Sequence, residues 1–570
     1  MTISVSKCLL PTADGVVCGV QIEPFGAVRR LDTGQSVSLE DAENTLLEGN
    51  SDAPFQLRMR WYRSTYPRGG AVCSVHPEKE ASLQCLVCLR CKVPTHLSYH
   101  CSVDCLKSHW NLHKDYHKQQ PAQVNGESNG YESLTKNSSI TDSWIEVGKG
   151  RTYTPSQEDV GYTLKFELYI VDRNHNVVPD PKGVVPISLY TSRVRPTPNP
   201  PQRALVRLVP PSAMQLHSER RFTVLSYNLL ADLYAKADFA KYCPAWSLHW
   251  NYRKRNMLRE MLAYKADILC LQEVQSDHFQ EFWSPELQKA GYVPIYKKKT
   301  AEIYTDNKYA IDGCATFFRR DRFQLVKKYE VEFNKAALSL AESFTTPTQK
   351  SQALNRLLKD NVALIAVLEA IEPGPPEAHG RRTLICVANT HIHANPELND
   401  VKLWQVHTLL KGLEKIAASA DIPMLVAGDF NSTPGSPAHM LLVKGRVEPS
   451  QVQHIDPLGF LKDQKLMHSL PLHSAYASMH DANGSVDSRL QKQKQRLDPI
   501  MHEPLFTNAT RDFKGTLDYI LYTSNSLQPT AVLELPADPD VFSKPDEQLP
   551  NAQYSSDHVA LLTEFQYIRL

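Results

Sequence analysis

The sequence predicts an α/β protein in which a large layered domain, residues 220–570, follows a β-rich region that a small Cys- and His-rich module interrupts. In the C-terminal part, short apolar strand-like runs alternate with helix-like stretches such as 253–265, a pattern typical of helices packed on a sheet. In the N-terminal part, strand-like segments lie on either side of the cysteines, at 15–22, 56–63, 151–153 and 162–171. The length of the chain allows several domains.

Composition limits the classes of partner before any motif is considered. The net charge is +1, from 63 basic and 62 acidic side chains, so a nucleic-acid site has to be a local patch or to rely on metal ions. The N-terminal residues lack the plan of a secretory signal. No apolar run reaches the roughly 20 residues that span a bilayer, so we expect no membrane association.

The β-rich region is expected to contain residues from both sides of the module. The phrase from Thr152 to Glu167 is similar to the late-strand corner of small immunoglobulin-like sandwiches, in which Trp61 would supply a core aromatic side chain. Two unrelated loop-rich segments are the alternative. The predicted parts are 1–72 and 143–192 (β-rich, immunoglobulin-like region), 73–117 (inserted module), 118–142 (flexible linker), 193–219 (Pro-rich linker) and 220–570 (α/β domain).

Six of the 12 cysteines fall between Cys73 and Cys105, among histidines. Because no secretory signal precedes them, metal ligation explains this cluster better than disulfides do. Four pairs have ligand spacing and supply enough donors for two tetrahedral Zn²⁺ sites, in which we expect the first pair to join the third and the second to join the fourth. The pairs are Cys73 with His76, Cys85 with Cys88, Cys101 with Cys105, and His113 with His117.

From Cys101 onward the module is expected to form a short helix that presents His113 and His117 on one face. The module resembles the MYND-type zinc finger, although His117 replaces its usual last cysteine and His100 is an extra residue. Cys91 is a rival partner for Cys88, and a metal-free loop is the alternative. The resemblance implies structural zinc and a surface that binds proline-rich peptides of partner proteins. The matching residues are Tyr99, Cys101, Cys105, Trp110, His113 and Lys114.

The other cysteines are scattered, mostly in apolar surroundings, and are predicted to be buried thiols. They are Cys8, Cys18, Cys243, Cys270, Cys314 and Cys386.

The stretch from Met424 to Ser436 carries the strongest sign of chemistry in the α/β domain. An apolar run ends in Gly428, Asp429 and Asn431, and prolines then force a turn. Gly428 allows a ligand to approach the backbone closely. On an extended chain, Asp429 and Asn431 face the same side. Such a carboxylate and amide suit a hard cation and a phosphate oxygen.

Other predicted strands of this domain also end in polar residues, and we interpret the set as one site. Unrelated structural polar ends are the alternative. The set consists of Asn228, Glu273, His391, Asp429 with Asn431, Asp518, and Asp557 with His558.

The order and types of these residues resemble the endonuclease/exonuclease/phosphatase superfamily, across essentially all of residues 221–570. The resemblance implies two β-sheets packed face to face with helices outside, and cleavage of phosphoesters with Mg²⁺. Attack on a phosphodiester builds negative charge on oxygen, so catalysis consists mainly of positioning and charge stabilisation.

The resemblance also implies a role for each metal and water contact. Glu273 is the principal Mg²⁺ ligand, helped by Asn228. Asp429 orients or deprotonates the attacking water, and Asn431 holds a phosphate oxygen or a second metal. One or two Mg²⁺ ions are implied, with Asp429, Asn431 and His558 as further candidate ligands.

Histidines complete the implied site. His558, oriented by Asp518, contacts the phosphate and the developing charge, and His391 binds a phosphate oxygen. His393 and Asp557 are expected to support these residues from behind, with a purely structural role as the alternative.

Longer runs resemble a narrower group, the poly(A)-specific deadenylase family named after the yeast carbon catabolite repressor four protein. It implies a Mg²⁺-dependent 3′-to-5′ exoribonuclease that shortens mRNA poly(A) tails and releases 5′-AMP. Partners in a deadenylase complex and a cytoplasmic location, with the nucleus as a second compartment, follow from that substrate. The sequence departs in lacking a leucine-rich repeat pattern and in having Ala394 where relatives often have Trp. The runs are 226–232, 250–274, 389–405, 513–523 and 555–561.

Substrate contacts are predicted from aromatic and basic residues near the site. Phe513 would stack an adenine, with Pro396 on its other face, and a core-packing Phe is the alternative. Insertions at 334–361 and 445–512 would form site walls or disordered excursions. The basic run 489–496 would meet RNA phosphates or remain a solvated loop.

Two other functions remain open at this point. A phosphatase or phosphodiesterase of the same fold could act on dinucleotides, 2′-5′ oligoadenylate or inositol phosphates, because fold alone does not separate these activities. A scaffold with an inactive site is the third reading, and the intact set of acidic, amide and His residues argues against it.

Overall fold

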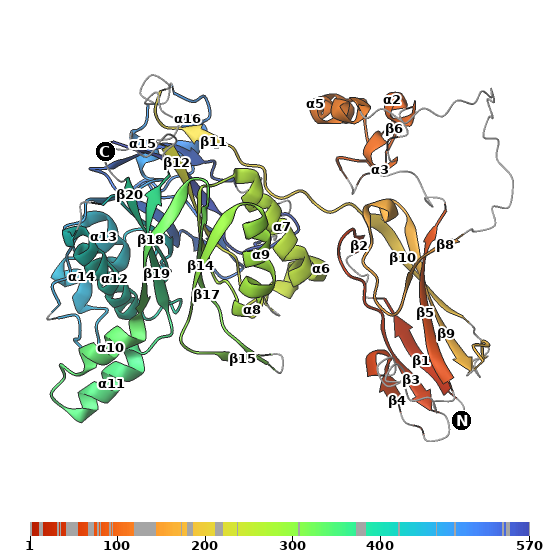
Figure 1. Cartoon of the computed structure of the whole chain (residues 1–570), viewed down its shortest axis with the longest axis horizontal. Coiled ribbons are helices and arrows are strands. Elements are labelled where there is room, and N and C mark those ends of the chain that lie inside the picture. The colour runs from red at the N-terminus through yellow and green to blue at the C-terminus, as the bar shows by residue number, and fades with distance from the viewer. Residues whose placement is uncertain are drawn as a thin grey trace. The chain divides into compact units, whose positions relative to one another are not determined.

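The chain forms two compact units, residues 1–198 and 199–570, which are described separately (Figure 1). The structure is a computed structural model. It describes residues 3–10, 15–30, 34, 36–41, 55–65, 73–76, 79, 81–90, 93, 95–118, 144–172, 174–178, 186–210, 221–235, 238–305, 308–371, 383–419, 422–462, 464–483, 486–537, 541–542 and 548–568.

Strands from both sides of the inserted module share one sheet in the N-terminal unit. The strand β5 (Phe55–Ser64), which precedes the module, pairs antiparallel with both β8 (Trp144–Lys149) and β9 (Thr163–Asp172), which follow it. Trp61 of β5 is fully buried and packs against Tyr153 and Phe166. The order is β2 (Val16–Val17), β10 (Ile187–Arg195), β9, β5, β8; a second sheet contains β1 (Ile3–Leu9), β3 (Phe25–Arg30) and β4 (Ser36–Ser38).

Two predicted strands of this unit are shorter than expected. The segment 15–22 pairs only at β2 and at an isolated bridge from Ile22 to Tyr153, and 151–153 contributes only that bridge. The turn after it contains the 3-10 helix η2 (Gln157–Asp159). The shared sheet agrees with one β-rich region, and its immunoglobulin-like character remains a prediction.

The single helix predicted after Cys101 is wrong, because the chain breaks there into short pieces. The Ser102 hydroxyl accepts a hydrogen bond from the Cys105 N–H and begins α4, and a turn at His109 ends it. The elements of the module are β6 (Leu83–Gln84), α2 (Leu86–Arg90), α3 (Thr95–Ser98), β7 (Tyr99–His100), α4 (Val103–Ser108), α5 (Trp110–His113) and η1 (Lys114–Lys118).

The C-terminal unit has the predicted layers: two sheets packed face to face, with helices outside. Apolar side chains such as Phe222, Leu364 and Phe565 fill the space between the sheets. The first sheet has the order β11 (Leu205–Arg207), β26 (Leu527–Leu533), β27 (Leu561–Tyr567), β12 (Arg221–Asn228), β13 (Ile268–Gln272), β17 (Gly313–Arg319), β14 (Tyr292–Lys298). The second has the order β18 (Phe323–Glu332), β19 (Val362–Ala370), β20 (Leu384–His391), β21 (Met424–Asp429), β25 (Asp518–Thr523), β22 (Leu472–Ser474).

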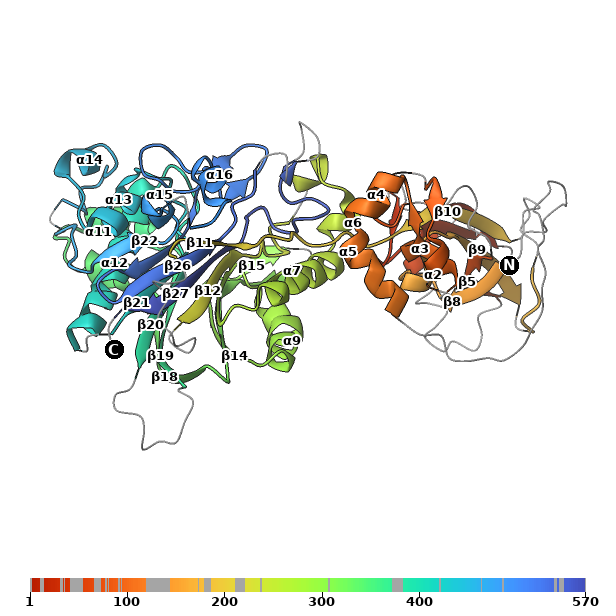
Figure 2. The same cartoon turned by 90° about the horizontal axis from the view of Figure 1, so that it is seen from above.

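Helices cover the outer face of each sheet (Figure 2). The helix α7 (Trp250–Tyr264) packs its Met257 and Met261 against the first sheet. The helix α12 (Asn399–Ser419) packs its leucines against the second. Further elements are η5 (Phe239–Lys241), α6 (Ala245–Leu248), α8 (Ser276–His278), the π-helix η6 (Phe279–Trp283), α9 (Ser284–Lys289), β15 (Ile303–Thr305), β16 (Lys308–Ala310), α10 (Phe333–Ala341), α11 (Pro347–Leu357), α13 (Pro437–Lys444), α14 (Pro449–Gln453), α15 (Ser478–Asp481), α16 (Leu490–Lys494), β23 (Asn508–Ala509) and β24 (Lys514–Gly515).

The polar residues predicted at strand ends meet at one edge of the sheets, although not all of them end a strand. Asp518 begins β25, and Asp557 and His558 precede β27. Both strands run antiparallel to their neighbours, and Asp518 is the register partner of Asp429. An antiparallel strand therefore brings its first residues to the edge where a neighbour brings its last.

Both insertions are folded where the structure describes them, so the disordered alternative is wrong there. The first contains α10 and α11, and the second contains α14 to α16 and β22. Basic side chains of 489–496 bind their own chain: Arg489 contacts Asp487 and Glu534, and Arg496 donates to the Leu535 carbonyl.

The scattered cysteines are buried as predicted, except Cys8, which is half-buried. None of the helices that the structure describes is both long enough and apolar enough for a bilayer span.

Candidate active site

Asn228 connects the two sheets at the edge where the polar residues gather. Its Nδ2 donates to Glu273 Oε1 and to Asp429 Oδ2, both at 3.0 Å, and its Oδ1 accepts from the Leu230 N–H at 3.0 Å. Asn228 ends β12 and Glu273 directly follows β13 in the first sheet, whereas Asp429 ends β21 of the second. One amide thus holds the principal carboxylates of both sheets together.

Glu273 is a carboxylate placed where its charge is costly. It has a positive φ of 54°, and its Oε2 accepts the Ala231 N–H at 2.9 Å. Burial, together with nearby Asp557 and Asp312, raises the pKa of Glu273 to about 7. A bound cation would favour the ionised form that burial disfavours.

The end of β21 requires glycine at position 428. Gly428 has φ 145°, and a Cβ there would lie 2.0 Å from the Thr390 carbonyl oxygen. Asn431 also has a positive φ, 47°, so the chain is not extended there and the predicted same-side pairing with Asp429 by strand geometry is wrong. Instead the Asn431 N–H donates to Asp429 Oδ1 at 2.8 Å, and its Nδ2 donates to the Ile392 carbonyl at 2.9 Å.

Asp429, Asp518 and His558 form a compact group whose ligand atoms lie within 4.8 Å of one another. His558 Nδ1 is 2.7 Å from Asp518 Oδ2, and its Nε2 is 3.7 Å from Asp429 Oδ2. Burial by itself lowers the pKa of His558, but Asp518, Asp557 and Asp429 outweigh it and hold this pKa well above its usual range. At neutral pH His558 therefore carries a positive charge.

Two neighbouring side chains donate hydrogen bonds to the carboxylates around His558. The Thr507 hydroxyl donates to Asp518 Oδ2 at 2.6 Å, and Asn508 Nδ2 donates to Asp557 Oδ2 at 3.1 Å. Asp518 Oδ1 is buried and has no hydrogen-bond partner among the described residues. Burial, followed by the charge of Asp518, raises the pKa of Asp429 to about 7.

The predicted histidine pair has two different environments. His391 is buried with its Nε2 3.6 Å from Asp429 Oδ2, and burial keeps its pKa well below the usual range, so the ring is neutral. His393 is half-buried at the rim, its N–H donates to Gln405 Oε1 at 3.0 Å, and burial lowers its pKa to about 4. Pro396 is exposed.

Phe513 is at the tip of a hairpin that begins at the site. Its strands β23 and β24 pair Asn508 with Gly515, and Thr507 and Asn508 at the base contact the acidic group. The Phe513 ring lies over Gly515, where a Cβ would be 2.9 Å from it, and the side chain is 36% exposed. A core-packing role for Phe513 is therefore wrong.

The inserted module brings its eight candidate ligands together as two groups in the predicted pairing, Cys73, His76, Cys101 and Cys105, and Cys85, Cys88, His113 and His117. The Sγ atoms of Cys73 and Cys105 are 3.6 Å apart, and His113 Nε2 lies 3.4 Å from Cys88 Sγ and 3.3 Å from His117 Nε2. Ligands around tetrahedral Zn²⁺ lie roughly 3.3–3.8 Å apart, given bond lengths near 2.0 and 2.3 Å, whereas a disulfide needs about 2.05 Å. Cys91 lies outside the described residues.

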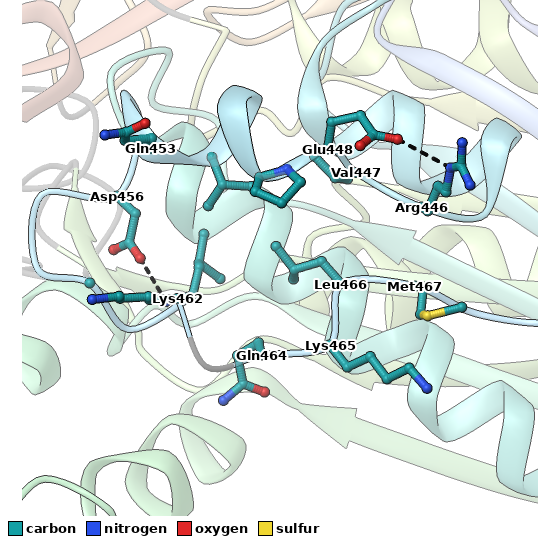
Figure 3. Close-up of a pocket in the computed structure, with 14 residues that line it drawn as sticks. Arg446, Val447, Glu448, Gln453, Asp456, Lys462, Gln464, Lys465, Leu466 and Met467 are labelled. Atoms are coloured by element: carbon teal, nitrogen blue, oxygen red, sulfur yellow. Dashed lines mark hydrogen bonds and ion pairs between the residues drawn. The ribbon is translucent and has the colours of Figure 1, made fainter.

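A separate cavity of about 650 Å³ belongs to the second insertion (Figure 3). All of its lining residues come from one stretch, Arg446 to Met467, and none is a predicted site residue. Arg446 and Glu448 form an ion pair at its rim. This stretch therefore forms a pocket of its own.

Comparison with known proteins identifies the family. The family model described as Endonuclease/Exonuclease/phosphatase family matches residues 225–558. The chain belongs to this family. It is 46% identical to carbon catabolite repressor protein 4 homolog 1 of Arabidopsis thaliana, covering 99% of this chain and 98% of that protein. It is 33% identical to the CCR4-Not complex 3′-5′-exoribonuclease subunit Ccr4 of Saccharomyces cerevisiae, covering 62% of this chain and 39% of that protein.

Solved structures give a fainter likeness. ANGEL2, described as a 2′,3′-cyclic phosphatase and crystallised with adenosine-2′,3′-vanadate, is 27% identical, with a TM-score of 0.47, over 64% of this chain and 99% of that one.

Nucleases of this family typically use Mg²⁺, and the residues present fit such an ion. Oxygen donors dominate the site, as Mg²⁺ prefers. The Glu273 and Asp429 carboxyls have raised pKa values, and the buried Asp518 Oδ1 accepts no hydrogen bond from the residues that the structure describes. Glu273, Asn228 and the group around Asp429 would hold the ion.

Several residues of the site were missed by sequence reasoning. Lys299 Nζ lies 3.0 Å from Asp312 Oδ2. The other carboxylate oxygen of Asp312, Oδ1, accepts a hydrogen bond from the Tyr234 hydroxyl at 3.0 Å. Arg253 is fully buried and donates to the Leu230 and Ser555 carbonyls. Asp312 stands just before β17, and Asp518 is the first residue of β25, so an acidic residue at the start of an apolar strand is the signal that could have identified Asp312.

Proposed function

We propose that the chain is a Mg²⁺-dependent 3′-to-5′ exoribonuclease that shortens the poly(A) tails of mRNA and releases 5′-AMP. The observation that carries the proposal is the connected set of Asn228, Glu273 and Asp429 beside the Asp518–His558 pair, in a chain similar to a carbon catabolite repressor 4 homologue over nearly its whole length. The names of fungal relatives include 3′-5′-exoribonuclease activity.

In the proposed mechanism, each group acts on the scissile phosphate or the water. Asp429, with a pKa of about 7, accepts a proton from the attacking water at neutral pH. His558, charged and oriented by Asp518, stabilises negative charge on the phosphate oxygens. Neutral His391 and the amide of Asn431 hold the phosphate. When bound, Mg²⁺ neutralises the phosphate and polarises the water.

The N-terminal module is proposed to bind two structural Zn²⁺ ions and to dock partner proteins. Apolar side chains are exposed on it, as a surface for proline-rich peptides requires. Fungal relatives are named as subunits of the CCR4-Not complex, so components of such an assembly are the proposed partners. The cytoplasm, and as a second compartment the nucleus, are the proposed locations, because an mRNA substrate would be met there. The exposed side chains are Leu86, Val87, Val103, Trp110 and Leu112.

The direct test is a time course with Mg²⁺ and a 5′-labelled RNA ending in A20, beside C20 and U20 controls. Stepwise loss of the A-tail, ending in 5′-AMP, is expected. If no RNA is cut while a dinucleotide or an inositol phosphate is hydrolysed, the proposed substrate class is wrong, and the protein is a phosphodiesterase or phosphatase that acts on a small molecule.

Magnesium affinity is expected to rise with pH up to about 7 and then to level off. The Glu273 and Asp429 carboxyls, each with a pKa of about 7, must lose protons before they ligate a cation. Calorimetric titration with Mg²⁺ at pH 6 and pH 8 measures the difference. Equal affinities at both values would contradict it.

The same two groups predict how the metal-free domain responds to pH. Their folded-state pKa is above the unfolded value near 4, so between about pH 4 and pH 7 the folded state binds more protons than the unfolded chain. Their contribution to stability is full below that window and is lost as the pH rises through it. Thermal unfolding without Mg²⁺ measures this trend, and a saturating ion should reverse it.

Lys402→Met is expected to lower kcat on the A-tail about tenfold. The buried Lys402 ammonium donates to the Asn431 carbonyl at 2.7 Å, and burial lowers its pKa to about 8. Methionine fills similar space without holding the turn at Asn431. The matched control is Lys411→Met on the same helix, where the ammonium pairs with Glu414 at the surface. Equal kcat values for the two variants would refute the positioning role.

Phe513→Ala is expected to lower kcat/KM on A20 about tenfold, because stacking on an aromatic ring contributes roughly 1–3 kcal/mol per base. The exposed ring is available for a base at the tip of its hairpin. Phe513→Tyr, which keeps the ring, is the control. An alanine variant that matches wild type on A20 rules out the stacking role.

A further inference from the structure

The hairpin of β15 and β16 carries an aromatic pair in solvent. Tyr304 is the direct register partner of Tyr309, and their ring centroids are 5.1 Å apart with the planes inclined by 58°. The two side chains are 62% and 70% exposed. Figure 1 shows β15 reaching beyond the main strands β14 and β17. Adjacent aromatic side chains kept in solvent are typical of a binding surface.

Both ends of this hairpin are held at the active site. Lys299, which precedes β15, pairs with Asp312, which follows β16, at 3.0 Å. Asp312 is among the charges that raise the pKa of Glu273, so this ion pair lies close to the candidate metal ligand. The Ser276 N–H donates to the Ile311 carbonyl at 2.8 Å. This hydrogen bond holds the segment that follows β16 next to the residues that follow Glu273.

One face of the hairpin packs on the protein and the other carries the tyrosines. Ala310 is buried against Ala231 and Leu233, and the Ala231 N–H is the donor to Glu273 Oε2. Successive side chains of a strand point to opposite faces. Tyr309 therefore points away from the packed face of Ala310, and Tyr304 points with it. The base of the hairpin is fixed while the aromatic pair remains accessible.

We infer that Tyr304 and Tyr309 form a stacking platform for bases of single-stranded RNA on the 5′ side of the scissile phosphate. The inference rests on the proposed exoribonuclease function. Tyr309 is three residues from Asp312, at most about 10 Å along an extended strand, so the platform lies within a few nucleotides of the site. The tilt of the rings leaves ring surface open to a base, and the exposed Lys298 before the hairpin supplies positive charge for the backbone.

The first test compares a long and a short substrate. In the full chain, Tyr304→Ala with Tyr309→Ala is expected to raise KM for A20 about tenfold or more. The kcat should remain unchanged, because the contact is equal in ground and transition states. Hydrolysis of the dinucleotide ApA, which is too short to reach the hairpin, should not change. Tyr304→Phe with Tyr309→Phe should match wild type. Tyr190→Ala, at a residue 56% exposed in the N-terminal unit, is the control.

A second test locates the stacked base. An abasic nucleotide is moved along the A-tail one position at a time. At the stacked position it should raise KM for wild type to the level of the double alanine variant, with no further effect on that variant.

Each other outcome overturns the inference in a recognisable way. Equal loss on ApA and A20 means that the alanines disturb the active site. An unchanged KM on A20 means that the hairpin does not bind RNA, and it would then be a contact for a protein partner. Failure of wild type to cut either RNA refutes the exoribonuclease function itself, and the platform with it.

Discussion

Glu273→Gln is expected to reduce turnover of an A20 tail about 1000-fold or more, because a metal ligand contributes several kcal/mol of charge stabilisation. Glu273 directly follows β13 and binds Asn228, and burial together with the charges of nearby carboxylates raises the pKa of Glu273 to about 7. Glutamine resembles the protonated carboxyl in shape and charge, so folding should survive. Initial rates at saturating Mg²⁺ measure the loss, and calorimetry should show weaker Mg²⁺ binding.

The matched control for this variant is Glu302→Gln, at an exposed acid before the hairpin, which should retain wild-type rates. The Asn228 and Ala231 donors both bind the carboxylate, and glutamine offers them one oxygen, so a cost of about 1 kcal/mol in folding free energy is expected. Activity of Glu273→Gln within tenfold of wild type would refute the assignment of Glu273.

Cys88→Ser is expected to reduce bound zinc from two ions to one and to unfold the inserted module. Cys88 Sγ is fully buried beside His113 Nε2. So small a module buries little core, and zinc binding contributes roughly 10–16 kcal/mol of apparent free energy to such folds. Elemental analysis measures the zinc content, and limited proteolysis of the full chain measures the unfolding.

Shortening of A20 by this variant should be unchanged, because the candidate active site lies in the unit formed by residues 199–570. Cys8→Ser, at a half-buried thiol outside both ligand groups, should retain two zinc ions. A Cys88→Ser protein that keeps two ions would mean that Cys88 is no ligand, and the neighbouring Cys91 would then be the candidate.

The layered α/β fold and the pairing of the candidate zinc ligands could be predicted, because both depend on patterns among residues that are close together in the sequence. Apolar runs with period two or with helical spacing determine strands and helices. Pairs separated by two or three residues bring thiolate and imidazole groups within reach of one ion. The helix after Cys101 was predicted wrongly because the spacing of His113 and His117 also fits shorter pieces: a turn at His109 ends α4, and α5 gives way to the 3-10 helix η1 at Lys114.

The sequence also identified some of the residues that form the candidate site. Asn228, Glu273, Asp429, Asp518 and His558 each stand beside an apolar strand, and chain alternation implies that such residues share an edge. The hydrogen bonds between these residues could not be predicted from the sequence, because the partners are far apart in the chain. Asn228 and Asp429, for example, are separated by 201 positions.

By itself, then, the sequence determined the layered α/β class of the C-terminal unit, the eight residues that could hold zinc, and the polar residues that lie at the rim of that unit. Only the tertiary structure decided that Lys299 pairs with Asp312, that Lys402 holds the Asn431 turn, and that the Tyr304–Tyr309 hairpin starts and ends at the site. The physical reason is that local patterns encode which face of an element is buried. The charge balance of a buried site depends on contacts between distant segments, which exist only after the two sheets have packed.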